Sequence, residues 1–120
     1  MKNKKTGQKL YQKAKKLIPG GTQLLSKRPE MFAPEIWPAY YSKSKGCYVW
    51  DLDNNKYIDI SIMGIGANIL GYSDDFVDNA VKNAITNGVS SSLNCPEEVE
   101  LAELLTDIHP WADMVRYSRS

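Results

Sequence analysis

The sequence predicts an α/β fold, and three features of the chain support that prediction. Apolar residues recur at helical spacing in three stretches, at residues 6–18, 73–87 and 96–109. Between the first two stretches, two runs rich in aromatic and β-branched residues flank a turn of Asp and Asn, which predicts a β-hairpin. Residues 114–117 have the composition of a further strand, and the helices outnumber the strands on which they could pack. We therefore interpret the chain as the N-terminal piece of a larger α/β protein.

The composition argues against several classes of partner. The net charge is +1, with 42% hydrophobic and 24% charged residues, which is ordinary for a globular protein. No apolar run approaches the ~18 residues of a membrane span, and the N-terminus has no apolar signal segment. Cys47 and Cys95 lie in no CxxC motif and near no His pair, so we expect free thiols in a reducing compartment. These observations predict a cytoplasmic protein that binds neither membranes nor nucleic acid.

The first helical stretch runs from Thr6 to Ile18, with Thr6 as the predicted N-cap and Pro19-Gly20-Gly21 as the stop. Nine Lys or Arg residues and no acidic residue precede Glu30. We interpret the lysines of this stretch as the solvated face of the helix. A basic arm that binds phosphate groups or anionic lipid is the alternative.

A loop without periodicity follows, from Thr22 to Pro38. It carries four large apolar side chains, Met31, Phe32, Ile36 and Trp37. We expect such a loop to be packed against the protein. Two interpretations stay open, a lid or rim of a binding pocket and an apolar strap over a core.

The predicted hairpin pairs Cys47–Trp50 with Tyr57–Ile60, and Tyr40–Ser44 is a candidate for a preceding strand. Asp and Asn side chains in the turn between the paired runs bond nearby backbone groups. Three glycines follow within eight residues, Gly64, Gly66 and Gly71. Glycine permits sharp bends and close approach of the backbone to another group, so we predict a glycine-lined loop that forms the wall of a small-molecule site.

The second predicted helix begins at Ser73, its N-cap, with aspartates in its first turn, and ends at Gly88. The third begins at Pro96 and ends near His109, which we interpret as a capping or surface residue. Ser90–Asn94 lies between these helices. Hydroxyls in a row can bind phosphate or carboxylate, although such a run is more often a plain loop.

The order of these motifs resembles a known family. The matching segments are Pro19-Gly20-Gly21, Val49 to Asp59, Gly64-Ile65-Gly66, Ile69 to Tyr72, Glu100 to Leu104 and Val115-Arg116-Tyr117. Together they are similar to the class III pyridoxal-phosphate aminotransferases, and closest to the glutamate-1-semialdehyde 2,1-aminomutase group. The string from Trp50 to Asp59 is the specific part of this resemblance, whereas the separate glycines are weak signals.

The resemblance implies the N-terminal part of a fold-type I pyridoxal-phosphate-dependent transferase: a helix, a small hairpin sheet, then helices that lead into the sheet of the large domain. It implies a homodimer with shared active sites and a small amino or keto substrate. Pyridoxal 5'-phosphate would serve as the electron sink for amino-group transfer. On this basis residues 1–72 belong to the small-domain region, and residues 73–120 begin the large cofactor-binding domain.

Few site residues carry over from the family. Ser120 matches the first residue of a turn that leads to the cofactor phosphate at a helix N-terminus. No lysine of this chain matches the one that binds the cofactor's aldehyde, so we expect residues 1–120 to be inactive alone. The substrate-carboxylate arginine of the aminomutase group corresponds to Lys27, with Arg28 beside it.

The substrate wall in the glycine loop corresponds to Met63, Gly64 and Ile65, and Ile65 stands where the aminomutase group has tryptophan. This difference predicts an amino donor or acceptor other than glutamate semialdehyde. The polar loop is expected near the partner subunit's site, through Ser90, Ser91, Ser92 and Asn94.

Two other functions are alternatives to amino-group transfer. One is a stand-alone, non-catalytic interaction module that binds a partner through the apolar loop at residues 31–37. The other is a nucleic-acid binder that uses the basic N-terminal stretch. It requires strongly salt-dependent binding, and we rank it last.

Overall fold

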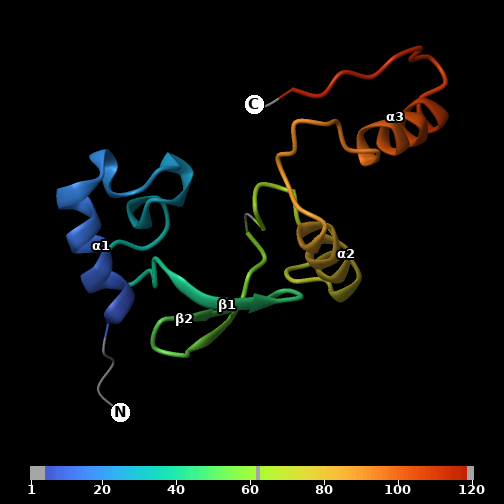
Figure 1. Ribbon diagram of the computed structural model, residues 1–120. Coiled ribbons are helices and arrows are strands. Elements are labelled where there is room, and N and C mark those ends of the chain that lie inside the picture. Colours follow the sequence, from blue (N-terminus) through green and yellow to red (C-terminus); the bar gives the residue numbers. More distant parts are fainter. Residues whose placement is uncertain (1–4, 62, 119–120) are drawn as a thin grey trace. The chain divides into compact units, whose positions relative to one another are not determined.

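The computed structural model describes residues 5–61 and 63–118, and this part contains helices and one small antiparallel sheet (Figure 1). The elements are α1 (Thr6–Leu17), β1 (Tyr41–Lys45), β2 (Tyr48–Asp51), β3 (Lys56–Ile58), α2 (Asp75–Thr86) and α3 (Glu97–Ile108). Single turns of 3-10 helix lie between α1 and β1, at Pro19–Gly21, Leu25–Lys27 and Pro29–Met31. The predicted α/β class is confirmed, and the predicted helices and hairpin strands are present within a few residues of the expected bounds.

The chain divides into two compact units, which we describe separately. Unit 1 comprises residues 1–79, with α1, the sheet and the first residues of α2. Unit 2 comprises residues 80–120, with the remainder of α2 and α3.

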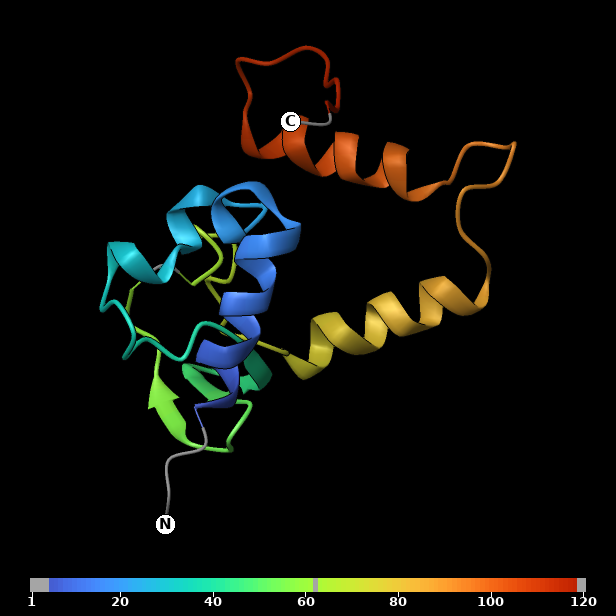
Figure 2. The same cartoon turned by 90° about the vertical axis from the view of Figure 1, so that its left-hand side faces the viewer.

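The start of α1 is tied to the hairpin turn between β2 and β3. Thr6, the predicted N-cap, is instead the first helical residue, and Lys5 at the N-cap position makes no side-chain cap bond. The carboxylate of Asp53 accepts hydrogen bonds from the Thr6 backbone N–H, at 3.0 Å, and from the Thr6 hydroxyl. A carboxylate suits this place because the first N–H groups of a helix lack intrahelical partners and carry the positive end of its dipole. Figure 2 shows the start of α1 beside the sheet.

One face of α1 fastens the loop that leads to β1. The Tyr11 hydroxyl donates a hydrogen bond to the Glu30 carboxylate, at 2.7 Å. The side-chain amide of Gln8 donates to the backbone carbonyls of Ile36 and Trp37, at 3.0 Å each. These bonds fasten an otherwise irregular loop to α1 at two places, Glu30 and Ile36–Trp37, although many of its side chains stay exposed.

The sheet has the order β1-β2-β3, and both pairs are antiparallel. Trp50 of β2 lies opposite Lys43 of β1 and opposite Lys56 of β3. Directly paired residues project from the same face of a sheet. Accordingly, the two ammonium groups lie 4.5 and 5.3 Å from the centroid of the Trp50 ring, in cation–π contact.

The N-cap of α2 differs from the predicted one by one residue. The carboxylate of Asp74 accepts hydrogen bonds from the backbone N–H groups of Phe76 and Val77, at 3.0 and 3.1 Å. Ser73 has a positive φ of 51°, outside the extended region that an N-cap residue adopts, so its prediction as the cap was wrong. Gly88 follows the helix with φ of 94°, the left-handed conformation expected where a helix ends.

In unit 2 the predicted third helix is confirmed, whereas the predicted strand after it is not present. Helix α3 begins directly after Pro96, and His109 occupies its C-cap. The predicted strand at Met114–Tyr117 is wrong, because the described residues of unit 2 offer it no partner strand and a strand is stable only when its backbone groups are paired. Instead, the Tyr117 hydroxyl donates to the backbone carbonyl of Glu98, at 2.9 Å.

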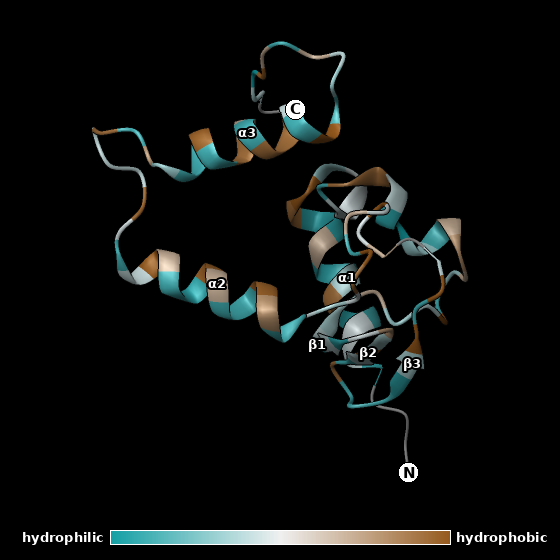
Figure 3. Ribbon diagram, turned by 90° about the vertical axis from the view of Figure 1, so that its right-hand side faces the viewer, coloured by the Kyte–Doolittle hydropathy of each residue, from teal (hydrophilic) through white to brown (hydrophobic). Residues whose placement is uncertain are grey.

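Little apolar surface is buried within the described residues. Tyr11 and Ala14, 5% and 7% exposed, are the buried hydrophobic side chains, and α2 and α3 contribute none. The apolar bands on these two helices are visible in Figure 3, and Phe76 is 85% exposed. No helix in residues 5–61 and 63–118 is long and apolar enough to cross a membrane.

Candidate functional site

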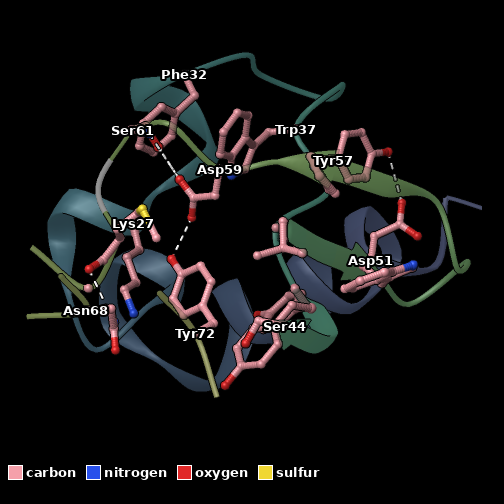
Figure 4. Close-up of a pocket in the computed structure, with 18 residues that line it drawn as sticks. Lys27, Phe32, Trp37, Ser44, Asp51, Tyr57, Asp59, Ser61, Asn68 and Tyr72 are labelled. Atoms are coloured by element: carbon pink, nitrogen blue, oxygen red, sulfur yellow. Dashed lines mark hydrogen bonds between the residues drawn. The ribbon is translucent and has the colours of Figure 1, made fainter. Parts of the chain in front are cut away.

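Unit 1 contains a cavity of about 430 Å³, and all of the residues that line it belong to that unit. The lining comes from three places in the sequence: the loop at residues 22–40, the sheet, and the glycine loop, by which we mean residues 59–72. Figure 4 shows the side chains around this space. A cavity of this size falls within the ~300–1,000 Å³ typical of small-molecule sites.

The glycine loop is closed at its base by a tyrosine–aspartate pair, which lines the cavity. The Tyr72 hydroxyl donates a hydrogen bond to the Asp59 carboxylate, at 2.6 Å, as drawn in Figure 4. The second oxygen of that carboxylate accepts bonds from the Ser61 backbone N–H, at 3.1 Å, and hydroxyl, at 3.0 Å. One carboxylate therefore joins the two ends of the loop and also fixes its first turn.

Electrostatics favour the form of the pair in which Asp59 is ionised and Tyr72 keeps its proton. Burial tends to raise the pKa of Asp59, but the hydrogen bonds from Tyr72 and Ser61 outweigh it and lower the pKa of that carboxyl. Burial and the Asp59 carboxylate together raise the pKa of Tyr72 to about 12. At neutral pH the tyrosine is thus a donor and the aspartate an acceptor.

A close backbone contact completes the closure of the glycine loop. Gly46 and Tyr72 exchange two backbone hydrogen bonds, at 2.8 Å each, as an isolated antiparallel bridge. Gly71 has φ of +90°, and a Cβ there would meet backbone atoms of Gly46 at 3.0–3.1 Å. Both the conformation and the lack of space require glycine at position 71. Inside the loop, the Asn68 amide donates to the Met63 carbonyl, at 3.2 Å.

The opposite part of the cavity is built on a second buried carboxylate, Asp51, which is 8% exposed. It accepts hydrogen bonds from the backbone N–H groups of Asp53 and Asn55, the Asn55 amide and the Tyr57 hydroxyl, at 2.8–3.1 Å. Burial tends to raise the pKa of Asp51, yet the bonds from Asn55 and the other donors lower it overall. Every oxygen of this group is occupied by the turn, so Asp51 shapes the hairpin and is not free to bind a ligand.

Aromatic rings form one wall of the cavity. The rings of Phe32 and Trp37 are stacked, with centroids 4.4 Å apart and an interplanar angle of 13°. Both line the cavity together with Trp50 of the sheet. The predicted packing of the apolar loop holds for two of its four large side chains: Phe32 and Trp37 line the cavity, whereas Met31 and Ile36 are 61% and 78% exposed.

The structure brings three of the predicted substrate residues to this cavity: Lys27, Met63 and Gly64 line it. Arg28 does not, because its guanidinium is engaged by the Leu25 carbonyl, at 3.2 Å, and by the Met31 sulfur, at 3.8 Å. Ile65 lies in the same loop but is 62% exposed and is not part of the lining.

The other predicted site residues lie elsewhere. The polar loop from Ser90 to Asn94 belongs to unit 2 and is exposed, and the Ser91 hydroxyl accepts a bond from the Leu93 backbone N–H, at 3.1 Å. Ser120, the predicted cofactor residue, lies outside the residues that the structure describes.

Sequence reasoning did not assign a role to Asp59 or Tyr72, although both lie in the segments that carry the family resemblance. The sequence contains a partial signal for this pair, because an acidic residue and a tyrosine flank the glycine cluster. Nothing in their spacing, however, shows that the two side chains meet.

Pyridoxal phosphate needs donors for its phosphate, a carboxylate for its ring nitrogen and an amine for its aldehyde. Both carboxylates that line the cavity, Asp51 and Asp59, are already bonded to protein donors, and Lys27 supplies the one amine among the described lining residues. The described residues therefore do not by themselves form a cradle for this cofactor. Their chemistry fits the edge of a site, where an anionic group of a substrate can be held.

Comparison with known proteins defines the class. The family model described as aminotransferase class-III matches residues 32–120. This chain therefore belongs to the class III aminotransferase family, as the sequence motifs predicted.

Two named relatives are glutamate-1-semialdehyde 2,1-aminomutases. The protein of Francisella philomiragia is 37% identical over 120 residues, which is 100% of this chain and 27% of that protein. The protein of a Sulfurihydrogenibium species is 37% identical over 118 residues, which is 98% of this chain and 27% of that protein. The chain thus spans about a quarter of the length of the curated relatives it matches.

Solved structures agree with this assignment. An omega-transaminase from Sphaerobacter thermophilus matches with a TM-score of 0.84 at 27% identity, over 99% of this chain and 26% of that one. A pyridoxal-phosphate form of the FumI protein from Sphingopyxis sp. MTA144 matches with a TM-score of 0.79 at 27% identity, over 90% of this chain and 25% of that one. The predicted fold, the N-terminal part of an α/β transaminase, is confirmed.

Proposed function

We propose that the chain is the N-terminal segment of a pyridoxal-phosphate-dependent enzyme that moves an amino group to or within a small carbonyl or amino-acid substrate. The observation that carries this proposal is the cavity of unit 1, which is built largely from the segments that match the class III family. The named relatives support it, since they include both a transaminase and aminomutases. Family membership does not favour the alternative of a stand-alone interaction module.

In this proposal Lys27 binds the substrate carboxylate. Its ammonium lines the cavity and has no hydrogen-bond or ion-pair partner among the described residues, whereas neighbouring Arg28 is engaged by Leu25 and Met31. Lysine holds an anion as a point charge, without the bidentate geometry of arginine. Met63, Gly64 and Ile65 belong to the loop that forms the wall against which the substrate is oriented.

The cofactor we propose for the whole protein is pyridoxal 5'-phosphate, which supplies the electron sink for the reaction when it is bound. Ser120 is the position of this chain that we assign to the approach of its phosphate. The described residues contribute the substrate side of the site. They bind and orient the carboxylate and, through the aromatic wall, exclude water from one side of the cavity.

We further propose a homodimer in the cytoplasm, in which the loop from Ser90 to Asn94 lies near the partner's site. Residues 1–72 would form the small-domain region and residues 73–120 the start of the cofactor-binding domain. Two cysteines that lie in no CxxC motif and near no His pair support a reducing compartment. Residues 1–120 alone would be inactive, since no lysine in them matches the one that binds the cofactor.

The test is cofactor uptake by the full-length gene product. We expect the purified protein to carry pyridoxal phosphate, visible as absorbance beyond the protein band, and to transfer an amino group from a donor to a 2-oxo acid or within one substrate. The 120-residue chain, prepared in parallel, should show neither property. A full-length protein that stays colourless when pyridoxal phosphate is added would overturn the proposal.

A further inference from the structure

We propose that the cavity of unit 1 selects an organic acid with a single carboxylate and a flat, uncharged apolar body. The carboxylate lies at the ammonium of Lys27, and the body lies against the stacked rings of Phe32 and Trp37. This inference rests on the proposed function and names the substrate class of the same site.

The charges that line the cavity limit the ligand to one anionic group. Among the described lining residues Lys27 is the cation, and Asp51 and Asp59 are the anions. Their hydrogen bonds to protein donors lower the pKa of both carboxyls, so they stay ionised at neutral pH. A first carboxylate is attracted to Lys27, and a second one on the same ligand would meet negative charge with no further cation among the described lining residues to pair it.

The nearby cations do not change this balance. The ammonium groups of Lys43 and Lys56 lie over the Trp50 ring, and neither lysine lines the cavity. The guanidinium of Arg28 is engaged within its own loop. In Figure 4, Lys27 lies on the side of the cavity opposite Asp51. The positive end of the site is thus separate from the carboxylate of the hairpin turn.

The shape of the wall determines the body of the ligand. Phe32 and Trp37 present stacked rings, and the backbone carbonyl of Trp37 is fixed by the side chain of Gln8 at 3.0 Å. Tyr57 and Tyr72 add aromatic surface, and their hydroxyls are already bound to Asp51 and Asp59. These rings offer flat apolar surface, and a planar apolar body can lie against them.

The experiment measures binding of two probes to the full-length protein by calorimetry: 3-phenylpropionate, with one carboxylate and a ring, and succinate, with two carboxylates. We expect succinate to bind at least roughly 10-fold more weakly, because its second carboxylate is unpaired and it has no ring to lie against Phe32 and Trp37. Lys27→Met should remove most of the phenylpropionate affinity, and Lys27→Arg should restore it. Phe32→Ala should weaken phenylpropionate roughly 3- to 10-fold through the lost ring contact, with little effect on succinate.

The control is Lys13→Met, which makes the same change of charge on the exposed side of α1, away from the cavity. It should leave both affinities unchanged. Succinate that binds as tightly as phenylpropionate, or binding that is insensitive to Lys27→Met, would overturn the inference. Failure to bind either probe by a protein that does take up pyridoxal phosphate overturns the inference and leaves the proposed function intact. Probe binding by a protein that takes up no cofactor would overturn the proposed function and leave the inferred ligand preference intact.

Discussion

At the scale of single residues, Asp59 and Tyr72 do most to define the glycine loop. They are 13 positions apart, and their side chains meet at 2.6 Å. A hydrogen bond to a charged acceptor contributes about 1.5–3 kcal/mol to stability, and less where solvent reaches it. The substrate wall that we propose around Met63 and Gly64 therefore depends on a pair that need not touch the substrate.

Tyr72→Phe removes the donor and leaves the Asp59 carboxylate without its partner. We expect a loss of about 1–2 kcal/mol in the free energy of unfolding of the full-length protein, measured by urea denaturation. Tyr41→Phe is the matched control, since the Tyr41 hydroxyl has no hydrogen-bond partner among the described residues and that side chain is 69% exposed. Equal stability of the two variants would show that the Tyr72 bond contributes nothing.

The same pair predicts how stability changes with pH. The pKa of Tyr72 is raised to about 12 in the folded state, from an ordinary value of 10.0, so its contribution is present below pH 10 and is lost as pH rises towards 12. The pKa of Asp59 is lowered from 3.8, so its contribution is present above that value and is lost as pH falls below it. Denaturation midpoints of the wild type and of Tyr72→Phe should therefore converge at both extremes of pH. A constant difference between them would contradict this account.

At the scale of elements, the sequence predicts structure that local chemistry determines better than structure that depends on a remote partner. Helix α1 and the hairpin turn follow from periodicity and from Asp and Asn side chains that bond their own neighbours, as Asp51 does to Asn55. The strand predicted at Met114–Tyr117 did not form, because a strand depends on a partner that composition cannot supply.

The candidate site, too, could be predicted only in part, because motifs are local and the contacts that shape the cavity are long-range. Lys27 and the glycine loop could be carried over from motifs, and the structure places Lys27, Met63 and Gly64 at one cavity. The contacts that shape the cavity join residues far apart in sequence, such as Gln8 with Trp37, and no periodicity reports them.

The contact between α1 and the hairpin turn gives a prediction at this scale. Asp53→Ala removes the carboxylate that accepts hydrogen bonds from Thr6 at the start of α1. We expect a loss of about 0.5–2 kcal/mol in the free energy of unfolding of the full-length protein, the range for lost helix caps. Asp113→Ala removes the same charge at an exposed aspartate that has no partner among the described residues, and it should be neutral. A loss equal to that of Asp53→Ala would show that net charge, not capping, is responsible.

Alanine substitutions at two glycines of the glycine loop can distinguish the cost of conformational strain from the cost of lack of space. Gly66 has φ of +77° and open space around it, whereas Gly71 has φ of +90° and backbone atoms of Gly46 within 3.0–3.1 Å of an added Cβ. Gly66→Ala should cost about 1 kcal/mol from strain alone. Gly71→Ala should cost at least 1 kcal/mol more, because the Gly46–Tyr72 bridge must shift. Thermal denaturation of both full-length variants measures the difference, and equal losses would mean that the bridge adapts freely.

At the scale of the whole molecule, the described residues expose far more apolar surface than they bury. Each Å² of apolar area removed from water contributes about 25 cal/mol, and here few side chains other than Tyr11 and Ala14 gain that contribution. Large single side chains such as Phe76 and Trp111 are more than four-fifths exposed, at 85% and 81%. Large apolar side chains left exposed in such numbers are typical of surfaces that contact other protein.

The 120-residue chain on its own should therefore bind the dye ANS strongly and unfold without a sharp cooperative transition. The full-length protein should bind little dye and unfold cooperatively. Circular dichroism and dye fluorescence on both proteins make the comparison. A cooperative, dye-free 120-residue monomer would instead favour the interaction-module alternative, because such a module must be stable alone.

The bond between Thr6 and Asp53 also affects when α1 can become ordered during synthesis of the protein. The two residues are 47 positions apart, so Asp53 leaves the ribosome about 2–10 s after Thr6 at ordinary rates of synthesis. A helix as short as α1, with 12 residues, is marginal in water by itself. During that interval the helix has neither its remote cap nor the loop that Gln8 and Tyr11 later fasten. Helix α1 therefore becomes ordered only after the hairpin has been translated, and its apolar face is open to chaperones until then.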